Sequence, residues 1–365
     1  MKNVIFLALM ASLVPGLCSA TPITLSVNTI TELRTAVSRA NLDGANSYTI
    51  TIAPGTYVDP NLHVSRSMTL DAVTDGTVTL LGSSSLPNRK GLILADGIGT
   101  NLTVDGIRFQ GAHISNLDGG NGAGIRDQVS GAGSGLTITD STFVGNQEGI
   151  LTGGSNGLER VVIQRSKFQN NGNASKNTGQ EHGIYVNSAA SVVIDGSVFC
   201  GQVGQGHNIK VRSAATTITN TQSYEGIAGG GCTNAGNASR GIDIPNGGLA
   251  SLANVDLFQG AGSPNWGMLS FGVEGVKYGA NSLTMRDVDF VSTRGGVAIQ
   301  WAAGAAPCLY DPATSFTGLA VSSLAGVCHD PPLGPAVVSE PGSTPLLIGA
   351  LVLFLWTGYR GYLTS

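Results

Sequence analysis

Short, similar segments of this chain place acidic, basic and cationic side chains at matching positions. EHGIYVNS and GHNIKVRS each carry a histidine two residues before an isoleucine, and SRGIDIPNGG and WGMLSFGVEG follow them. The residues of this set that could transfer protons or hold charge are His182, Tyr185, His207, Lys210, Arg212 and Asp243. Together, a base, an acid and a cation can remove a proton beside a carboxylate and protonate a leaving oxygen. These residue types indicate elimination, or inversion of configuration, at a carbon next to a carboxylate.

More than one residue is a candidate for the cation and for the base. The cation could be Arg212 or Arg240, and the acid could be Tyr185. The candidate bases are Lys210, His182 and His207. Four further polar residues are candidates for binding a substrate, namely Arg126, Asn187, Arg240 and Glu274.

A longer repeat contains these segments. An alternating strand that ends near an aromatic residue, as in LTITDSTFVG, precedes a second strand built on Gly-Ile, about seven times at intervals of roughly 25 or 34 residues. The aligned apolar residues of the second strand are Ile125, Ile150, Ile184, Ile209, Ile242, Met268 and Val297. One repeat is too short to enclose its own apolar side chains, so repeats must stack about 4.8 Å apart around a shared core. The sequence predicts an all-β fold, a right-handed parallel β-helix, over residues 21–329.

The repeat also predicts which side chains leave the core. Because side chains alternate along a strand, the residue after each inward isoleucine points outward. That outward column contains Arg126, Leu151, Tyr185, Lys210, Asp243 and Leu269. Two residues further along, it contains Gln128, Gly153, Asn187, Arg212, Pro245 and Phe271. Neighbours in a column lie about 5 Å apart. We therefore expect one polar patch, which consists of Tyr185, Asn187, Lys210, Arg212 and Asp243.

Some placements stay open. Glu274 is expected in a turn after its strand, where it could be a further acid near the polar patch. His182 and His207 share the parity of the inward isoleucines, so they could stack inside the helix or at its corner. Polar residues in register also form ladders that satisfy each other. The alternative is therefore a non-catalytic surface protein that binds glycan or forms a rigid rod. It is favoured if the patch residues pair with each other and no groove borders them.

Charge and composition favour some classes of function and argue against others. A charged strip on a β-helix face suits an extended uronic-acid polymer, so we favour a lyase or a C5-epimerase for an acidic polysaccharide. Hydrolysis ranks lower, because it needs two carboxyl groups and Asp243 has no acidic partner in its column. The net charge of -4 and the pI of about 5.7 argue against nucleic acid. No Walker or dinucleotide motif opens a helix, and no two cysteines lie within four residues, so we expect neither cofactor nor metal.

A capping segment precedes the repeats. TELRTAVSRAN has helical spacing, with Thr31 as a possible N-cap and Leu33, Ala36, Val37 and Ala40 on one face. A solenoid needs such a cap, because its first coil otherwise exposes apolar core and unpaired strand edges.

This cap, together with the following ITIAPGTY, resembles the start of a known superfamily. It is similar to the N-terminal cap and first coil of right-handed parallel β-helix proteins that include pectate lyases and related polysaccharide lyases, over roughly residues 24–305. The superfamily also holds epimerases, hydrolases and proteins without catalysis, so the resemblance implies the fold more than the activity. The calcium-binding Asp cluster of pectate lyases and the Asp-Pro-His-Asp motif of alginate C5-epimerases are not visible in this sequence.

The N-terminus and the cysteines indicate export. Residues 1–20 contain Lys2, an apolar stretch and small residues before Thr21, which is typical of a secretory signal peptide. The remaining cysteines form an even set with three possible pairings in an oxidising compartment. We expect the pairings between sequence neighbours, Cys200 with Cys232 and Cys308 with Cys328. The predicted location is the cell surface, the outer envelope or the medium.

The C-terminus has the composition of a sorting signal. A Pro- and Ser-rich linker at 330–345 leads to an apolar segment at 346–359 and a short tail at 360–365. The order Glu-Pro, Ser-Thr, apolar run and terminal Arg resembles the PEP-CTERM sorting tails of exported bacterial proteins. It predicts a contact with the membrane through the apolar segment. The oligomeric state stays open.

Overall fold

The computed structural model describes residues 21–83, 85–153, 157–304, 306–319 and 328. In this part the chain forms 25 β-strands, one α-helix and one short 3-10 helix. The chain divides into two compact units, Met1–Pro331 and Pro332–Ser365, and all described residues lie in the first. The predicted signal peptide, linker, apolar segment and tail therefore lie outside the described residues. Within those ranges, no helix has the length and apolar character that crossing a membrane requires.

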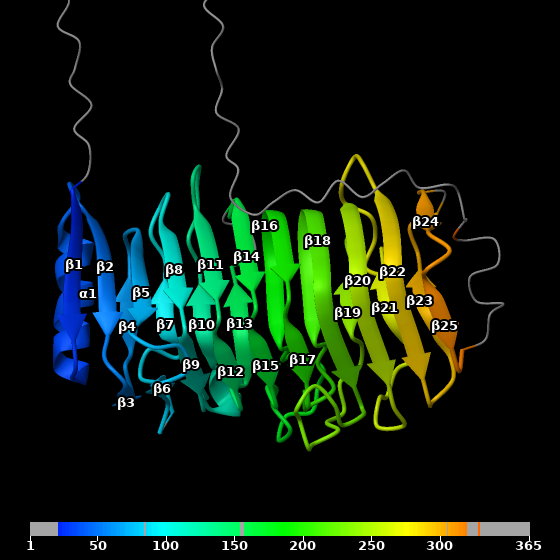
Figure 1. Ribbon diagram of the computed structural model, residues 1–365, viewed down its shortest axis with the longest axis horizontal. Helices are drawn as coiled ribbons and strands as arrows, with labels where there is room; N and C mark the ends of the chain where they lie inside the picture. The colour runs from blue at the N-terminus through cyan, green and yellow to red at the C-terminus, as the bar shows by residue number, and fades with distance from the viewer. Residues whose placement is uncertain (1–20, 84, 154–156, 305, 320–327, 329–365) are drawn as a thin grey trace, which may run out of the picture. The chain divides into compact units, whose positions relative to one another are not determined.

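The strands pair in parallel along three lines, and each coil of the chain visits the lines in turn (Figure 1). The first face contains β1 (Pro22–Val27), β2 (Ser47–Ile52), β5 (Met68–Ala72), β8 (Asn101–Asp105), β11 (Gly135–Thr139), β14 (Arg160–Gln164) and β24 (Cys308–Tyr310). The second face contains β3 (Gly55–Val58), β6 (Val78–Leu81), β9 (Ile107–Gln110), β12 (Thr142–Val144), β15 (Lys167–Gln169), β17 (Val198–Cys200) and β25 (Ser315–Thr317). The third face contains β4 (Leu62–Val64), β7 (Gly91–Ala95), β10 (Ala123–Asp127), β13 (Glu148–Thr152), β19 (Ile242–Ile244), β21 (Gly267–Phe271) and β23 (Val297–Trp301).

Four long strands bend from one face to the next. They are β16 (Ile184–Asp195), β18 (Ile209–Glu225), β20 (Leu249–Gln259) and β22 (Ser282–Ser292). β16 and β18 begin on the third face, where they pair with each other, and continue onto the first. The result is the parallel β-helix that the repeats predict, with one repeat for each coil.

Stacked side chains fill the interior. On the third face, Ile125, Ile150, Ile184, Ile209 and Ile242 lie in register and are fully buried, as predicted. On the second face, Phe109, Phe143, Phe168 and Phe199 form a ladder with ring centroids 4.7, 4.7 and 4.8 Å apart. Each rung therefore buries its apolar residues against the rungs on both sides.

The predicted register is wrong at the last two coils of the column. Ile242 pairs with Leu269, which pairs with Ile299, whereas Met268 and Val297 do not occupy the isoleucine column. The strand β21 is buried along its whole length. Its adjacent apolar residues Met268 and Leu269 therefore both suit the core, and the sequence alone does not show which of them continues the isoleucine column. As a consequence, Asp243 has Ser270 as its neighbour in the outward column.

The α-helix α1 (Ile30–Leu42) caps the N-terminal end. Its buried residues are Leu33, Ala36, Val37 and Ala40, as predicted. The predicted N-cap is wrong, because Thr29 and not Thr31 caps the helix. The Thr29 hydroxyl accepts a hydrogen bond from the backbone N–H of Glu32, and the Glu32 side chain bonds back to the backbone of Thr29. This reciprocal pair satisfies two free N–H groups and fixes the start of the helix.

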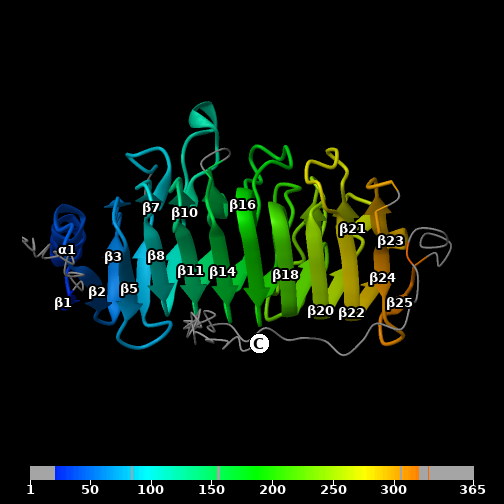
Figure 2. The ribbon, with the colours of Figure 1, turned by 90° about the horizontal axis from the view of Figure 1, so that it is seen from above.

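Two disulfides join Cys200 to Cys232 and Cys308 to Cys328, which confirms the predicted pairing. The first ties the end of β17 to the loop between β18 and β19. That loop is one of several that lead from the second face to the third. The loop before β10, which contains the 3-10 helix η1 (Asn116–Asp118), projects at the top of Figure 2. These loops bring polar residues to the beginning of the third face.

Candidate active site

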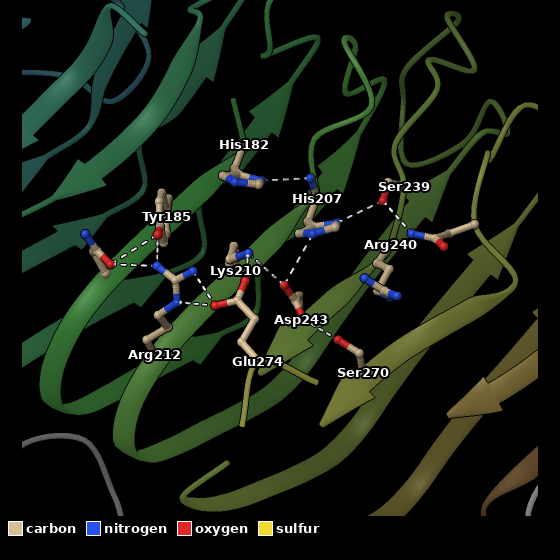
Figure 3. A network of polar contacts seen from close by, with 12 residues as sticks. His182, Tyr185, His207, Lys210, Arg212, Ser239, Arg240, Asp243, Ser270 and Glu274 are labelled. Atoms are coloured by element: carbon tan, nitrogen blue, oxygen red, sulfur yellow. Dashed lines mark hydrogen bonds and ion pairs between the residues drawn. The ribbon is translucent and has the colours of Figure 1, made fainter. Parts of the chain in front are cut away.

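The outward column of the third face places the polar patch in one region. Tyr185 on β16 pairs with Lys210 on β18, and Lys210 pairs with Asp243 on β19. Arg212 lies two residues beyond Lys210, and its Nη1 is 2.7 Å from Oδ1 of Asn187. Figure 3 shows these side chains converging from three successive coils. The predicted adjacency of the polar patch is therefore confirmed, whereas the catalytic roles of its residues stay a prediction.

Glu274 bridges the two cations of the polar patch. It lies in the loop after β21, as expected for a turn residue. Its Oε1 is 2.8 Å from Nζ of Lys210, and its Oε2 accepts hydrogen bonds from Arg212, at 2.9 Å from Nε and also from Nη2. Nζ of Lys210 is also 3.2 Å from Oδ2 of Asp243. Nζ of Lys210 thus contacts two carboxylates, and its predicted role as base stays a prediction.

The phenol of Tyr185 sits in cationic surroundings. Nη1 of Arg212 donates a hydrogen bond to the phenol oxygen, and the phenol donates to Oδ1 of Asn187 at 3.1 Å. The guanidinium carbon of Arg212 is 5.1 Å from the centre of the ring, and Nζ of Lys210 is 5.7 Å from it. The neutral ring of His182 packs against the phenol in a T-shaped arrangement, with 5.1 Å between the ring centroids. The phenol oxygen thus lies within reach of Arg212, and its hydroxyl proton is directed at Asn187.

His182 and His207 stack at the corner where the loops enter the third face, with ring centroids 5.1 Å apart. Nδ1 of His182 accepts the backbone N–H of His207 at 2.9 Å, so Nε2 carries the proton in the neutral ring. Burial lowers the pKa of His182 well below its usual value, and the neighbouring His207 and Lys210 lower it further. Burial also lowers the pKa of His207, although its hydrogen bond with Asp243 acts in the opposite direction. Both imidazoles are therefore neutral near pH 7.

A chain of hydrogen bonds orients His207. Its Nε2 lies 3.3 Å from Oδ2 of Asp243, and its Nδ1 lies 3.2 Å from Oγ of Ser239. Oγ of Ser239 accepts a hydrogen bond from the side chain of Asn265 at 2.8 Å, which leaves the hydroxyl proton for His207. The lone pair of each imidazole is thus already engaged. Neither His182 nor His207 presents a free basic nitrogen to a substrate.

Asp243 is the buried anion of the site. Burial alone would raise its pKa, but the hydrogen bond from His207 and the charge of Lys210 outweigh that effect and keep the pKa below its usual value. Ser270 donates a further hydrogen bond to its Oδ1. Ser270 was not predicted as a neighbour of Asp243, because the register at β21 differs from the predicted one. Ser239 and Asn265 were not predicted either, because they lie in loops of unequal length. The only signal for Ser239 in the sequence is that it directly precedes Arg240 in the repeat.

The two remaining candidates lie on either side along the helix axis. Arg240 donates from Nη2 to Oε1 of Gln300, and its buried Nε has no partner among the described residues. Arg126 is separated from Tyr185 by the rung of Leu151, so it lies outside the polar patch. Its Nε and Nη1 are buried without a hydrogen-bond partner in the described part of the chain. The roles of Arg126 and Arg240 in binding substrate stay a prediction.

A buried acid lies behind the histidine pair. Oε2 of Glu148 accepts the backbone N–H of His182 at 2.8 Å, and Glu148 is 1% exposed. Burial raises the pKa of Glu148 well above its usual value, and the nearby carboxyl group of Glu181 adds to this effect. Burial therefore favours the protonated form of Glu148 in the folded protein.

Replacing Glu148 by Gln should change how stability depends on pH. The unfolded chain releases the Glu148 proton above a pH of about 4.5, whereas the folded chain keeps it, so this group destabilises the wild type increasingly as pH rises. Glu148→Gln has no titratable group at this position, so it lacks this pH dependence. Its unfolding free energy relative to wild type should rise by up to about 1.4 kcal/mol per pH unit as the pH increases above about 4.5, measured by urea unfolding. A difference that stays constant above pH 4.5, or one that is equal in the control Glu159→Gln at an exposed position, would contradict the assignment.

Comparison with known proteins gives distant structural likenesses. No protein-family model and no curated protein matches this chain. The A-module of a mannuronan C-5 epimerase from Azotobacter vinelandii is similar at 16% identity and a TM-score of 0.47, over 77% of this chain and 76% of that chain. ORF18 of Geobacillus virus E2 is similar at 10% identity and a TM-score of 0.40, over 81% and 60%. An alginate lyase from Paenibacillus sp. is similar at 14% identity and a TM-score of 0.32, over 80% and 99%. At such levels, the function of this chain has to be inferred from its own residues.

Proposed function

We propose that this protein is an exported enzyme that cleaves an acidic polysaccharide by β-elimination at a uronic acid. One observation carries the proposal: Lys210 and Arg212 hold a carboxylate, that of Glu274, directly beside the phenol of Tyr185. A uronic acid needs the same arrangement, because its carboxylate must be neutralised before the proton on the adjacent C5 can be removed. The two disulfides are in keeping with an oxidising compartment outside the cytoplasm.

Tyr185 is the group that transfers the proton. Arg212 stabilises its phenolate, which takes the proton from C5 of the uronic acid. The electrons of the C5–H bond form a double bond between C4 and C5, and the bond from C4 to the glycosidic oxygen breaks. The phenol then gives its proton to that leaving oxygen. Both transfers pass through one oxygen, so the proton and the leaving group depart from the same side of the sugar.

This geometry favours elimination over epimerisation. An epimerase must return a proton to the opposite face of the sugar, which requires a second proton donor across the ring. The imidazoles of His182 and His207 lie next to Tyr185 rather than opposite to it, and both are engaged by other groups. Their role is to position: His182 packs against the phenol, and His207 with Asp243 keeps Lys210 in place.

The test is to incubate the full chain with polymers of mannuronate, guluronate, galacturonate and glucuronate and to follow the absorbance of the new double bond. At least one polymer should give a steady rise. Arg212→Ala should lower kcat by about 10² to 10³-fold, because it removes the donors that stabilise developing negative charge. Arg160→Ala, an exposed arginine on the first face, should keep the wild-type rate. No absorbance on any polymer, or an equal loss in both variants, would contradict the proposal.

A second candidate function is a non-catalytic protein that binds or displays glycan. It is favoured by the mutual pairing of the polar patch, where every charged residue contacts one of opposite charge. In addition, a hollow of about 780 Å³ lies against α1, where Arg34, Arg39 and Tyr48 are among its lining residues; none of the patch residues lines it. This alternative predicts retention on a uronate column with no new double bond and no change in chain length.

A further inference from the structure

We propose that Glu274 occupies, in the free protein, the position that the carboxylate of a uronic acid takes in the complex, so that substrate binds by displacing it. This inference rests on the proposed function and adds that Glu274 competes with the substrate carboxylate for Lys210 and Arg212. Glu274 offers one oxygen to Lys210 and the other to Arg212. Arginine and carboxylate groups recognise each other through such directed hydrogen bonds, and any carboxylate that reaches this place can make them.

Glu274 is the removable partner of the ion pairs. The side chains of Lys210 and Arg212 are 11% and 19% exposed, whereas that of Glu274 is 38% exposed. The cations belong to β18, within the wall of the β-helix, and Glu274 reaches them from a loop outside it (Figure 3). Asp243 stays paired with Lys210 when Glu274 leaves. When the substrate carboxylate replaces that of Glu274, the number of negative charges beside Lys210 and Arg212 therefore stays the same.

The loop backbone stays in place while the side chain leaves. The N–H of Glu274 bonds to the carbonyl of Pro245 at 2.9 Å, and the N–H of Lys277 bonds to the carbonyl of Asn246 at 3.0 Å. The hydroxyl of Tyr278 donates to the carbonyl of Arg212 at 3.1 Å, which fastens the loop to β18. Rotation of the Glu274 side chain is enough to free both cations, because it needs no change in these contacts.

Displacement reduces the apparent affinity for substrate. Only the fraction of molecules with Glu274 turned away can bind, so the observed dissociation constant equals the intrinsic constant divided by that fraction. The effect applies to a polymer with carboxylates, since it is the carboxylate that competes. A polymer whose carboxyl groups have been reduced to alcohols neither displaces Glu274 nor benefits from its removal.

The experiment measures binding of uronate oligosaccharides to Tyr185→Phe and to Tyr185→Phe with Glu274→Gln, so that the ligand is not consumed. Glu274→Gln keeps the size of the side chain but removes the charge that competes. We expect binding about tenfold tighter in the double variant, a shift that corresponds to the loss of two partly exposed ion pairs. Glu159→Gln, an exposed glutamate elsewhere on the β-helix, is the matched control and should bind like its parent.

The possible outcomes distinguish a failure of the displacement from a failure of the proposed function. Equal or weaker binding by the double variant would overturn the displacement and leave the proposed function intact. An equal gain with the carboxyl-reduced polymer would also overturn it, because Glu274 would then act as a steric cover. If neither folded protein binds any uronate oligosaccharide, the proposed function fails, and the displacement fails with it.

Discussion

Tyr185→Phe should abolish cleavage of the polymer while the protein still folds and still binds it. The variant lacks the single oxygen that we assign both to removing the C5 proton and to protonating the leaving oxygen. General acid–base catalysis contributes about 10² to 10⁴-fold, and the loss of both roles at once places the expected decrease in kcat at about 10³ to 10⁴-fold. Binding should change little, because Lys210 and Arg212 still hold the carboxylate.

Tyr224→Phe is the matched control for this experiment. Tyr224 lies on the same strand β18, but on the second face, where it stacks on Phe258 and its hydroxyl bonds to Gln222 at 3.4 Å. Removing that hydroxyl should leave kcat unchanged. If Tyr185→Phe kept more than about a tenth of the wild-type rate, the proton would have to pass through another group, and the assignment of Tyr185 would be wrong.

Phe143→Ala should lower the free energy of unfolding by about 3 to 5 kcal/mol, the usual range for emptying a buried aromatic position. Phe143 is fully buried and stacks on Phe109 at one side and on Phe168 at the other. Its loss removes the transfer free energy of the ring, leaves a cavity between two rungs and breaks both stacks. Urea unfolding followed by fluorescence or circular dichroism measures the difference.

Phe143→Leu distinguishes the free-energy cost of the cavity from that of the lost ring stacking. It refills most of the space without restoring the ring contacts, so its effect should fall between those of wild type and Phe143→Ala. A loss below about 1 kcal/mol for Phe143→Ala would be typical of a surface position, and it would contradict a shared core that each rung builds with its neighbours.

The sequence predicts the column of Tyr185, Lys210 and Asp243 because two simple periodicities determine it. Side chains alternate along a strand, and the repeat length corresponds to one coil, so residues far apart in the chain become neighbours at a spacing of about 5 Å. The same reasoning fails where either periodicity is lost. At β21 two adjacent apolar residues, Met268 and Leu269, both suit the core, so the alternation does not determine the register.

The contacts made by loop residues could not be predicted in this way. His182 and His207 share the parity of the inward isoleucines, but the chain turns just before each strand, and parity no longer gives the direction of a side chain there. Ser239 reaches His207 from a loop with no counterpart of equal length in the other repeats. The reach of Glu274 to Lys210 depends on how its loop is fastened to the preceding coil, which no pattern in the sequence specifies.

The most direct test of the account is the reaction of the full chain with uronate polymers in D2O, followed by proton NMR and by the length of the polymer chains. We predict new C4=C5 double bonds at chain ends, shorter chains, and no deuterium at C5 of the sugars that remain. Deuterium at C5 with unchanged chain length would indicate epimerisation, and a polymer that stays unchanged would indicate binding without catalysis. Either result would contradict the assignment of Tyr185, Lys210 and Arg212 to an elimination.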